Sequence, residues 1–408
     1  MKLFQLDVKT AYLNAPIDHD IYVRQPKGFE NSDKNGNELV WKLKKSLYGL
    51  KQSGRMWHNC LHTFLVENGF KQLISDNCIY VNDGTSYKII LIVWVDDIVI
   101  ASSSVNEAEA LKMQLSTRFK MKDFGTLSNF LGIQFEVTES GIKMHQSQYA
   151  GKILDKFKMT ECNPKQLPCD LGASNIDFDS QTNFLEDPRK YREIVGSLVY
   201  LMTCTRPDLC FAVTILSQHL ANPKVAHFNM AKHVMRYIKG TLDHGLCFQK
   251  SPLKIVGFTD ASWASTGDRR SISGYCYMLG EESCLVSWKS KKQPIVALSS
   301  CEAEYISVTY AIQEGVFLQQ LIDEMGINSV SNNVILHVDN KGAIDLSKNP
   351  VHHQRTKHIS IRYHFIRSKI LDGSFVLLYV PSKENIADMF TKPCTKFSLQ
   401  LFNVVQKI

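Results

Sequence analysis

Two aspartates stand side by side inside an apolar stretch of the first half of the chain. The run KIILIVWVDDIVIAS puts Asp96 and Asp97 between two β-branched segments, which predicts two strands joined by a tight turn. Carboxylate and phosphate oxygens together are the ligands that Mg²⁺ prefers. A third acid, Asp7, closes a short apolar strand, where an unpaired charge would be costly. The three acids could form a metal site, although an acidic turn in an ordinary sheet explains the adjacent pair slightly better.

Further acids follow predicted strands in the last third of the chain. Asp260 ends the strand in LKIVGFTDAS, and Asp339 ends the strand in VILHVDNKGA. Acids at the carboxyl ends of apolar strands fit the crevice where α/β sheets bind ligands. For Asp339, an N-cap of the following helix is the alternative.

A glutamate heads the apolar face of the long helix predicted over residues 301–326. Glu304 begins a buried stripe that continues through Val308, Ala311, Gly315, Leu318, Ile322 and Met325. Glu302 lies about 200° around the helix from Glu304, which predicts that it faces solvent. A carboxylate at the end of a core stripe requires a partner. A glutamate favoured at the helix N-terminus by the helix dipole is the alternative.

The composition limits the classes of protein and partner in which these acids can function. The 408 residues carry 47 Lys and Arg against 40 Asp and Glu, a net charge of +7 that permits a polyanionic partner without demanding one. The 11 cysteines include no CxxC pair, which excludes a zinc site of the usual spacing. The odd cysteine count, and an N-terminus without the apolar segment of a secretory signal, favour an intracellular protein. The longest apolar run, residues 89–101, is too short and too charged to span a bilayer, so we expect no membrane partner.

The order of the elements predicts several domains. Residues 1–157 mix strands with amphipathic stretches, and the polar segment that follows contains three prolines. Residues 191–250 have helical apolar spacing, and Gly240 to Pro252 is predicted to be a turn. From residue 253, strands are followed by alternating helices and strands, which fits an α/β domain. We therefore expect domains at 1–157, 158–252 (a mostly helical, thumb-like connection) and 253–395, with a tail at 396–408.

Motifs along almost the whole chain resemble one family. They are QLDVKTAYLNAPIDHDIYVRQPKGFE, KSLYGLKQSGRMWH, IVWVDDIVIAS, FKMKDFGTLSNFLGIQF, YREIVGSLVYLMTCTRPD, HVMRYIKGT, FTDASWAS, RRSISGY, VSWKSKKQ, VALSSCEAEYIS, RTKHISIRYHFIR and ENIADMFTK. In order and spacing, residues 1 to about 395 resemble the reverse transcriptase–ribonuclease H region of a Ty1/copia-type retrotransposon Pol polyprotein. The resemblance implies an α+β reverse transcriptase palm followed by a ribonuclease H-like α/β domain with a mixed sheet.

The resemblance implies a polymerase site around the first acids. Asp7 and Asp96 would ligate two Mg²⁺ (or Mn²⁺) ions, with Asp97 supporting, in RNA-directed DNA synthesis from an RNA template, a DNA primer and dNTPs. Tyr12 would act as a steric gate against the nucleotide 2′-OH, and Gln52 would contact the nucleotide; a core aromatic and a polar loop residue are the alternatives. Lys51 and Arg55 would contact phosphates, where surface solvation is the default for any single basic residue.

Two substitutions and the start of the chain depart from the family pattern. Trp94 stands where the family has tyrosine, and Gly54 stands where it has proline, which loosens the loop. Met1 lies six residues before Asp7, so the upstream fingers strands of the family are expected to be missing. We therefore expect an incomplete polymerase.

The resemblance completes the second acidic set with Asp388 of ENIADMFTK. Asp260, Glu304, Asp339 and Asp388 would form a ribonuclease H site, with two divalent ions that offset the mutual repulsion of the carboxylates. Such a nuclease cleaves the RNA strand of an RNA–DNA hybrid endonucleolytically and recognises backbone and 2′-OH groups. The basic residues expected to track phosphates are Lys289, Lys291, Lys292, Arg355, Lys357, His358 and Arg362.

The sequence thus predicts a retrotransposon Pol fragment that acts in the cytoplasm or nucleus, with the oligomeric state open. A retrotransposon relic that binds nucleic acid without catalysis is the alternative function. Salt-sensitive binding without metal-dependent cleavage would select that alternative.

Overall fold

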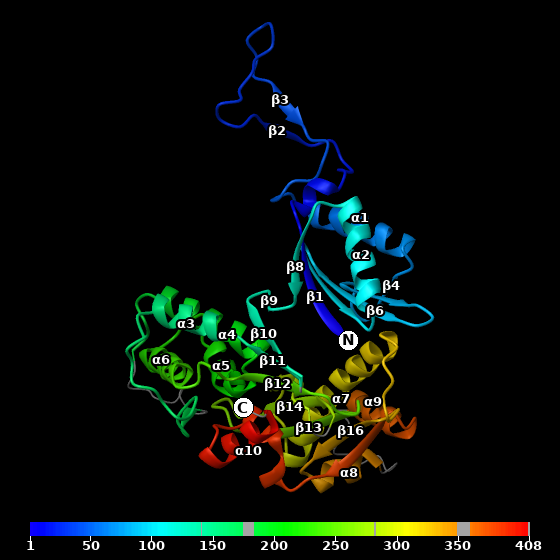
Figure 1. The fold of residues 1–408 in the computed structure, drawn as a ribbon. Helices are drawn as coiled ribbons and strands as arrows, with labels where there is room; N and C mark the ends of the chain where they lie inside the picture. The colour runs from blue at the N-terminus through cyan, green and yellow to red at the C-terminus, as the bar shows by residue number, and fades with distance from the viewer. Residues whose placement is uncertain (140, 174–182, 281–282, 349–359, 407–408) are drawn as a thin grey trace. The chain divides into compact units, whose positions relative to one another are not determined.

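The computed structural model describes residues 1–139, 141–173, 183–280, 283–348 and 360–406 (Figure 1). The chain divides into two compact units. Unit 1 contains Met1–Phe130 with Glu324–Gly326, and unit 2 contains Leu131–Asp323 with Ile327–Ile408. Each unit is described by itself below.

Unit 1 is built on a six-stranded antiparallel sheet in the order β4-β5-β6-β7-β1-β8. Two helices, α1 (Ser53–Glu67) and α2 (Val105–Arg118), pack their apolar residues against β1, β6 and β7. In α1 the buried residues Trp57, Leu61 and Leu65 recur at every fourth position, which is the spacing of one helix face. The strands are β1 (Lys2–Val8), β4 (Lys71–Gln72), β5 (Ile79–Asp83), β6 (Lys88–Trp94), β7 (Asp97–Ser102) and β8 (Met121–Thr126).

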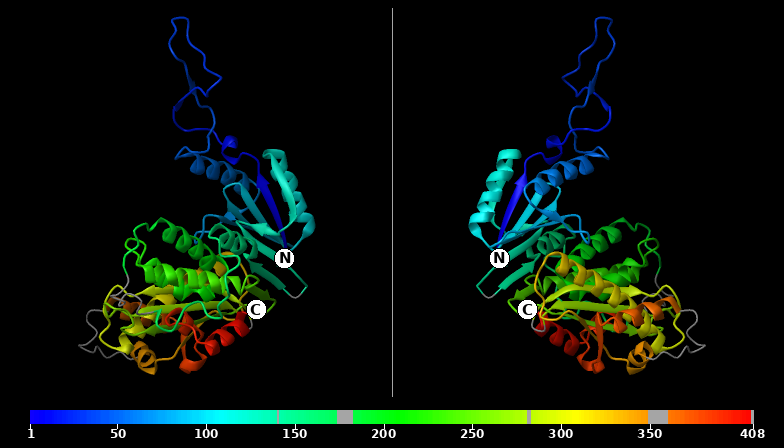
Figure 2. Two further views of the ribbon diagram at one scale, coloured as in Figure 1. Left: turned by 90° about the vertical axis from the view of Figure 1, so that its left-hand side faces the viewer. Right: turned by 90° about the vertical axis from the view of Figure 1, so that its right-hand side faces the viewer.

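A slender arm extends from the sheet of unit 1 (Figure 2). It follows the short 3-10 helix η1 (Ala11–Asn14) and contains the two-stranded ribbon of β2 (Tyr22–Arg24) and β3 (Val40–Lys42). Tyr22 and Trp41 remain 57% and 43% exposed, so the ribbon contributes little to the core of the unit.

The first part of unit 2 combines helices with a small sheet in the order β12-β11-β10-β9. Its elements are β9 (Asn129–Phe130, whose two residues belong to unit 1), β10 (Ile133–Val137), β11 (Gly141–His145), α3 (Ser147–Lys156), α4 (Arg189–Cys204), η3 (Pro207–Leu209), α5 (Cys210–Ser217), α6 (Val225–Lys239) and β12 (Gly245–Gln249). The helices predicted over 191–250 are confirmed up to Lys239, where α6 ends. The turn predicted from Gly240 to Pro252 is wrong in part, because β12 lies inside it and pairs with β11.

A buried ion pair ties these helices together. Arg206 and Asp208 are 2% and 3% exposed, and their charged groups lie 2.7 Å apart. Arg206 also donates to the carbonyl oxygen of Thr241, a residue that follows the end of α6. The pair therefore links η3 to the end of α6.

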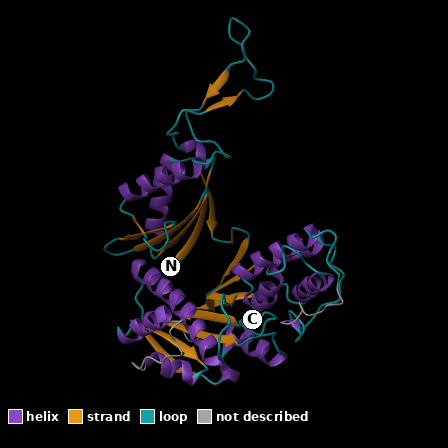
Figure 3. Ribbon diagram, turned by 180° about the vertical axis from the view of Figure 1, so that it is seen from behind, coloured by secondary structure: helices purple, strands orange, loops and turns teal. Residues whose placement is uncertain are grey.

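The second part of unit 2 is a five-stranded mixed sheet in the order β15-β14-β13-β16-β17. Strands β13, β14 and β15 run antiparallel, whereas β16 and β17 run parallel to β13, which confirms the predicted mixed α/β architecture. Its elements are β13 (Ile255–Ser262), β14 (Ile272–Leu279), β15 (Leu285–Lys292), α7 (Ser300–Glu324), β16 (Val334–Val338), α8 (Lys341–Lys348), α9 (Ser360–Leu371), β17 (Phe375–Tyr379), η5 (Ser382–Glu384), η6 (Ile386–Phe390) and α10 (Lys396–Gln406) (Figure 3).

Two glycines allow close packing on this sheet. A Cβ on Gly315 of α7 would lie 2.8 Å from the ring of Phe375 and from the Tyr277 hydroxyl, so the helix can approach the sheet only without one. A Cβ on Gly274 of β14 would lie 2.7 Å from the Cβ of Phe390. The 3-10 helix η6 can therefore pack against the opposite face of the sheet only because Gly274 has no side chain.

The observed boundaries differ from the expected domains at 157 and 252. Residues 131–157 belong to unit 2 because β11 pairs with β12 and α3 packs with α4 and α6. One apolar cluster joins the helices α3 to α6 with residues of β13, β14 and η6, so the connection and the mixed sheet share a core.

Candidate active site

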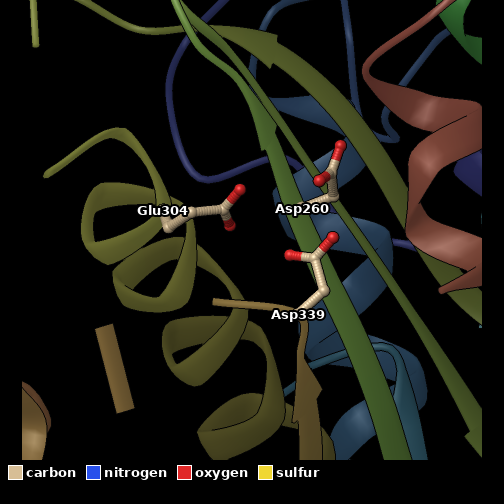
Figure 4. Close-up of side chains that lie close together, drawn as sticks. All are labelled: Asp260, Glu304 and Asp339. Atoms are coloured by element: carbon tan, nitrogen blue, oxygen red, sulfur yellow. The ribbon is translucent and has the colours of Figure 1, made fainter. Parts of the chain in front are cut away.

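Three carboxylates of unit 2 converge at one edge of the mixed sheet. Asp260 of β13, Glu304 of α7 and Asp339, which directly follows β16, each offer an oxygen within 4.8 Å of the others (Figure 4). Strands β13 and β16 are parallel neighbours, so their carboxyl ends meet at the same edge. Helix α7 brings Glu304 there in its second turn. The three acids that the strand ends and the helix stripe pointed to are thus together.

The structure disagrees with the alternative interpretations of Asp339 as a helix cap and of Glu304 as a solvent-facing residue. The helix after β16 is capped by Asn340, whose side-chain oxygen accepts a hydrogen bond from Ala343 N at 3.0 Å. Asp339 is therefore not needed as the N-cap. Glu304 is only 6% exposed, so it does not reach solvent from the helix N-terminus.

Burial and mutual repulsion dominate the electrostatics of the cluster. Desolvation raises the pKa of Asp260, which is 1% exposed, to about 7. Desolvation, followed by the charges of Asp260 and Asp339, raises the pKa of Glu304 to about 9. A divalent cation would neutralise this concentrated negative charge.

The hydrogen bonds of Glu304 leave room for such an ion. Its Oε1 accepts from Ala261 N at 3.1 Å. Among the residues that the structure describes, nothing donates to its buried Oε2. A buried carboxylate oxygen without a donor fits a metal ligand.

Asp388 of η6 stands beside the three-carboxylate cluster. Its Oδ1 lies 2.9 Å from Lys392 Nζ, and the same ammonium lies 3.5 Å from Asp260 Oδ2. The Thr391 hydroxyl donates a hydrogen bond to Asp260 Oδ2. Sequence analysis missed Lys392 and Thr391, although the spacing of four residues between Asp388 and Lys392 was a visible signal.

The prediction that Glu302 faces solvent is wrong. Glu302 is 8% exposed, and its Oε2 accepts from Leu298 N at 2.8 Å. Its side chain folds back toward the segment before α7, where the Leu298 N–H needs an acceptor. Glu302 thus lies two residues from Glu304 but outside the acidic cluster.

The acids of unit 1 lie on adjoining strands. Asp7 of β1 is the register partner of Asp97 of β7, and Val8 N donates to the Asp96 carbonyl oxygen at 2.7 Å. Desolvation, with the charges of Asp7 and Asp96, raises the pKa of Asp97. Within the described residues, Asp260, Glu304 and Asp339 are the one set of three acids whose oxygens lie close enough together to hold a metal ion. The three acids of unit 1 do not form a second such set.

The predicted tight turn is confirmed. Trp94 pairs with Asp97, so Val95 and Asp96 form the two-residue connection between β6 and β7. Val95 has a φ of 55°, which is strained for a β-branched residue. Its carbonyl oxygen accepts from the Trp57 indole at 2.7 Å, which holds the turn against α1.

A tyrosine that sequence analysis missed connects this turn to Tyr12. The Tyr48 hydroxyl donates to Asp96 Oδ2 at 2.7 Å, and the Tyr48 ring lies 4.3 Å from the Tyr12 ring, centroid to centroid. Burial, with the Asp96 carboxylate, raises the pKa of Tyr48 to about 12. Gln52 directly precedes α1, where a Cβ on Gly54 would lie 3.7 Å from the Tyr12 hydroxyl.

The predicted phosphate-contacting residues have different surroundings. Lys51 is exposed, whereas Arg55 lies 2.5 Å from Asp18 Oδ2 and is already paired. Lys292 lies 3.0 Å from Asp268 Oδ2, whereas Lys289 and Lys291 are exposed. Arg362 is half-buried on α9. Arg355, Lys357 and His358 lie outside the described residues.

None of the helices in the described ranges combines the length and the apolar composition that a membrane-spanning segment needs.

A family model and individual known proteins match this chain, and all of them are of the same kind. Residues 1–170 match the family model described as "Reverse transcriptase (RNA-dependent DNA polymerase)". The chain is 38% identical to a retrovirus-related Pol polyprotein from transposon TNT 1-94 of Nicotiana tabacum over 98% of its own length and 30% of that protein. It is 31% identical to a putative transposon Ty5-1 protein of Saccharomyces cerevisiae, over 76% of this chain and 100% of that protein.

The chain therefore spans less than a third of the plant Pol polyprotein. Among solved structures, a crystal structure of LC11-RNase H1 in complex with RNA/DNA hybrid aligns with 34% of this chain and 94% of its own chain, at 19% identity and a TM-score of 0.25.

Proposed function

The chain belongs to the Pol polyproteins of Ty1/copia-type retrotransposons, and from this membership we propose that unit 2 hydrolyses the RNA strand of RNA–DNA hybrids. Unit 1 would be the palm of an RNA-directed DNA polymerase. Both would act inside the cell, in the cytoplasm or nucleus, where the element is copied.

The observation that carries the nuclease proposal is the set of Asp260, Glu304 and Asp339 oxygens within 4.8 Å of one another. Two of these acids are almost fully buried, and one oxygen of Glu304 lacks a donor within the described residues. Uncompensated negative charge at this density is costly, which supports binding of Mg²⁺ or Mn²⁺.

Each acidic residue then has a defined role. Asp260, Glu304, Asp339 and Asp388 would hold two divalent ions, which supply an activated water and neutralise charge on the scissile phosphate. The backbone N–H of Ala261 orients the Glu304 carboxylate, and the Thr391 hydroxyl orients that of Asp260. Lys392 would balance the charge of Asp260 and Asp388 when fewer ions are bound.

The polymerase half of the proposal is supported by a looser arrangement of acids in unit 1. Asp7 and Asp97 face each other across two strands, with Asp96 at the turn beside them. These acids would hold two ions for nucleotide addition. Tyr12 and Gln52 would contact the incoming dNTP, with a DNA primer on an RNA template as the polymer substrate.

A labelled RNA–DNA hybrid incubated with Mg²⁺ or Mn²⁺ tests the nuclease. We expect wild type to cleave the RNA strand and Glu304→Gln to lower the rate by more than about 100-fold, because a metal ligand is lost. Glu302→Gln is the matched control, since it changes the same residue type in the same helix outside the cluster. Absence of cleavage by wild type, or equal rates for the two variants, would refute the nuclease.

Primer extension on an RNA template tests the polymerase. We expect incorporation of dNTPs by wild type and none by Asp96→Asn. Hybrid binding without cleavage or extension would instead favour the non-catalytic relic.

A further inference from the structure

Two histidines of α1 lie beside the strands at the edge of the sheet in unit 1. His58 and His62 are four residues apart, so their side chains leave the same side of the helix. Their rings stack, with centroids 6.0 Å apart and an angle of 15° between the ring planes. Both side chains are half-buried. A histidine pair at this helical spacing can bind one metal ion, and the proposed polymerase uses neither residue.

Ring nitrogens of both histidines converge on one hydroxyl group. His62 Nδ1 lies 3.2 Å from Tyr80 Oη, and His58 Nε2 lies 3.4 Å from the same oxygen. Tyr80 belongs to β5, is 1% exposed and packs in the core that α1 covers. The helix and the strand therefore hold two imidazole nitrogens around one buried oxygen.

The second of these nitrogens is only weakly engaged. Every contact of His58 Nε2 is long: 3.2 Å to Gln72 Nε2, 3.4 Å to Asn77 O and 3.4 Å to Tyr80 Oη. The shortest hydrogen bond of Gln72 instead goes to the Asn77 carbonyl oxygen, at 2.7 Å. A normal hydrogen bond of this kind measures about 2.9 Å. A stronger partner, such as a metal ion, can therefore compete for the lone pair of His58.

A thiol lies on the same face of the sheet. Cys78 directly precedes β5, and its carbonyl oxygen accepts from Val93 N of β6 at 2.9 Å, which continues the pairing of the two strands. Because Cys78 is two residues before Tyr80, both side chains leave the same face. Burial, followed by the charge of the nearby Cys78 thiolate, raises the pKa of Tyr80 to about 12. The thiol and the two imidazoles do not all lie within 4.8 Å of one another, so a side-chain rotation must complete the set.

The types of donor select the kind of metal. Imidazole nitrogen and thiolate sulfur bind ions such as Zn²⁺ and Co²⁺, whereas Mg²⁺ requires oxygen ligands. A zinc site with three protein ligands leaves its fourth position to water or another oxygen. The chain has no CxxC pair, and here the histidine pair of α1 takes the place of such a motif. This donor set thus differs in kind from the acids of both proposed active sites.

We propose that His58, His62 and Cys78 bind one Zn²⁺ ion, which links α1 to the hairpin of β4 and β5. The role of the ion is structural. Helix α1 also holds the turn beside Asp96, because the Trp57 indole donates to the Val95 carbonyl oxygen. Zinc would therefore stabilise the helix that supports this turn.

Cobalt binding tests the site by a signal that carboxylates do not give. The full chain, reduced and freed of metal, is titrated with Co²⁺ in excess Mg²⁺. We expect one equivalent of Co²⁺ to produce the near-ultraviolet charge-transfer band of a cobalt–thiolate bond, and Zn²⁺ to remove that band. Cys78→Ser should abolish the band. His58→Gln and His62→Gln should each weaken Co²⁺ binding by more than about 100-fold, because a lost ligand costs more than a lost outer-shell partner.

Matched controls change the same residue types elsewhere in unit 1. Cys60 also belongs to α1, but its thiol donates to the Asn14 carbonyl oxygen at 3.9 Å. His19 is 72% exposed and lies 2.8 Å from Asp18 Oδ1. Cys60→Ser and His19→Gln should keep both the band and the affinity for Co²⁺.

Hydrogen exchange provides a second, local measurement. In wild type, Zn²⁺ should increase the protection of α1 and of residues 71–83, because the ion joins these segments. In the histidine variants, Zn²⁺ should change neither segment. Should a variant unfold, the zinc-dependent protection of the wild type decides the question. Absence of the thiolate band or of this protection in wild type, or a band that survives Cys78→Ser, would overturn the proposal.

Discussion

The ammonium of Lys392 lies 3.5 Å from the buried carboxylate of Asp260, a group that we assign to metal binding. A fixed cation at this place repels a divalent ion. The lysine is 44% exposed, so solvent reduces the repulsion to about 1 kcal/mol. We expect Lys392→Gln to tighten Mn²⁺ binding by roughly fivefold, measured by electron paramagnetic resonance titration.

The control for this variant is Lys383→Gln, which removes an exposed charge from the neighbouring η5. It should leave Mn²⁺ affinity nearly unchanged. Weaker binding in Lys392→Gln would mean that the lysine helps to assemble the site, contrary to this prediction.

The raised pKa values of Asp260 and Glu304 predict the pH dependence of the metal-free protein. The folded state holds protons on these acids up to about pH 7 and 9, whereas the unfolded chain releases them near pH 4. Their contribution to stability is therefore complete below about pH 4 and is lost as the pH rises through the folded pKa values. In EDTA, we expect the thermal midpoint of wild type to fall from pH 6 to pH 9 more steeply than that of Glu304→Gln.

Adding Mg²⁺ should restore the midpoint more at pH 9 than at pH 6, because ligands must be deprotonated. Glu302→Gln should keep the wild-type pH dependence. A Glu304→Gln variant with the wild-type slope would contradict the assignment.

The positive φ of Val95 predicts a stabilising substitution. Its backbone strain is worth about 1–3 kcal/mol, and glycine at this position costs about 0.5–1 kcal/mol of entropy. We expect Val95→Gly to raise the free energy of unfolding of unit 1 by about 1 kcal/mol in urea denaturation. Val40→Gly is the control, because Val40 is an exposed strand valine without a positive φ. This variant should lower the free energy of unfolding. Loss of stability in both variants would argue against strain at the turn.

The buried pair of Arg206 and Asp208 should be sensitive to removal of one partner. Asp208→Asn leaves a buried guanidinium without its counter-ion, and we expect a loss of about 3–5 kcal/mol in urea denaturation of unit 2. Lys156→Met breaks the exposed pair with Glu193 and should cost less than about 1 kcal/mol. Replacing both buried partners by Met and Leu should recover part of the loss. Equal costs for the buried and exposed variants would contradict this reasoning.

The acids that follow strands could be predicted from the sequence because local patterns mark them. The β-branched runs around Asp96 and Asp97 located the hairpin to within about one residue, since strand pattern and turn agree. The stripe headed by Glu304 identified which glutamate joins the cluster. The prediction for its neighbour Glu302 was wrong, because the angular pattern of a helix does not account for a side chain that folds back to accept from the segment before the helix.

Contacts between distant segments could not be predicted this way. Strand β12 pairs with β11, about a hundred residues earlier, and its five residues carry no clear alternation. Tyr48 is a single exposed aromatic in a loop, so no periodicity marks its bond to Asp96. Lys392 lies just beyond a 3-10 helix whose position on the sheet depends on the absence of a side chain at Gly274.

The packing of η6 against Gly274 affects when Asp260 gains its partners during protein synthesis. Thr391 and Lys392 contact Asp260 from this segment, and Asp388 pairs with Lys392, so the segment must leave the ribosome before Asp260 gains these partners. Domains generally fold as units once their sequence has emerged. Until residues 388–392 have left the ribosome, Asp260 therefore lacks the hydroxyl and ammonium groups that contact it in the folded unit.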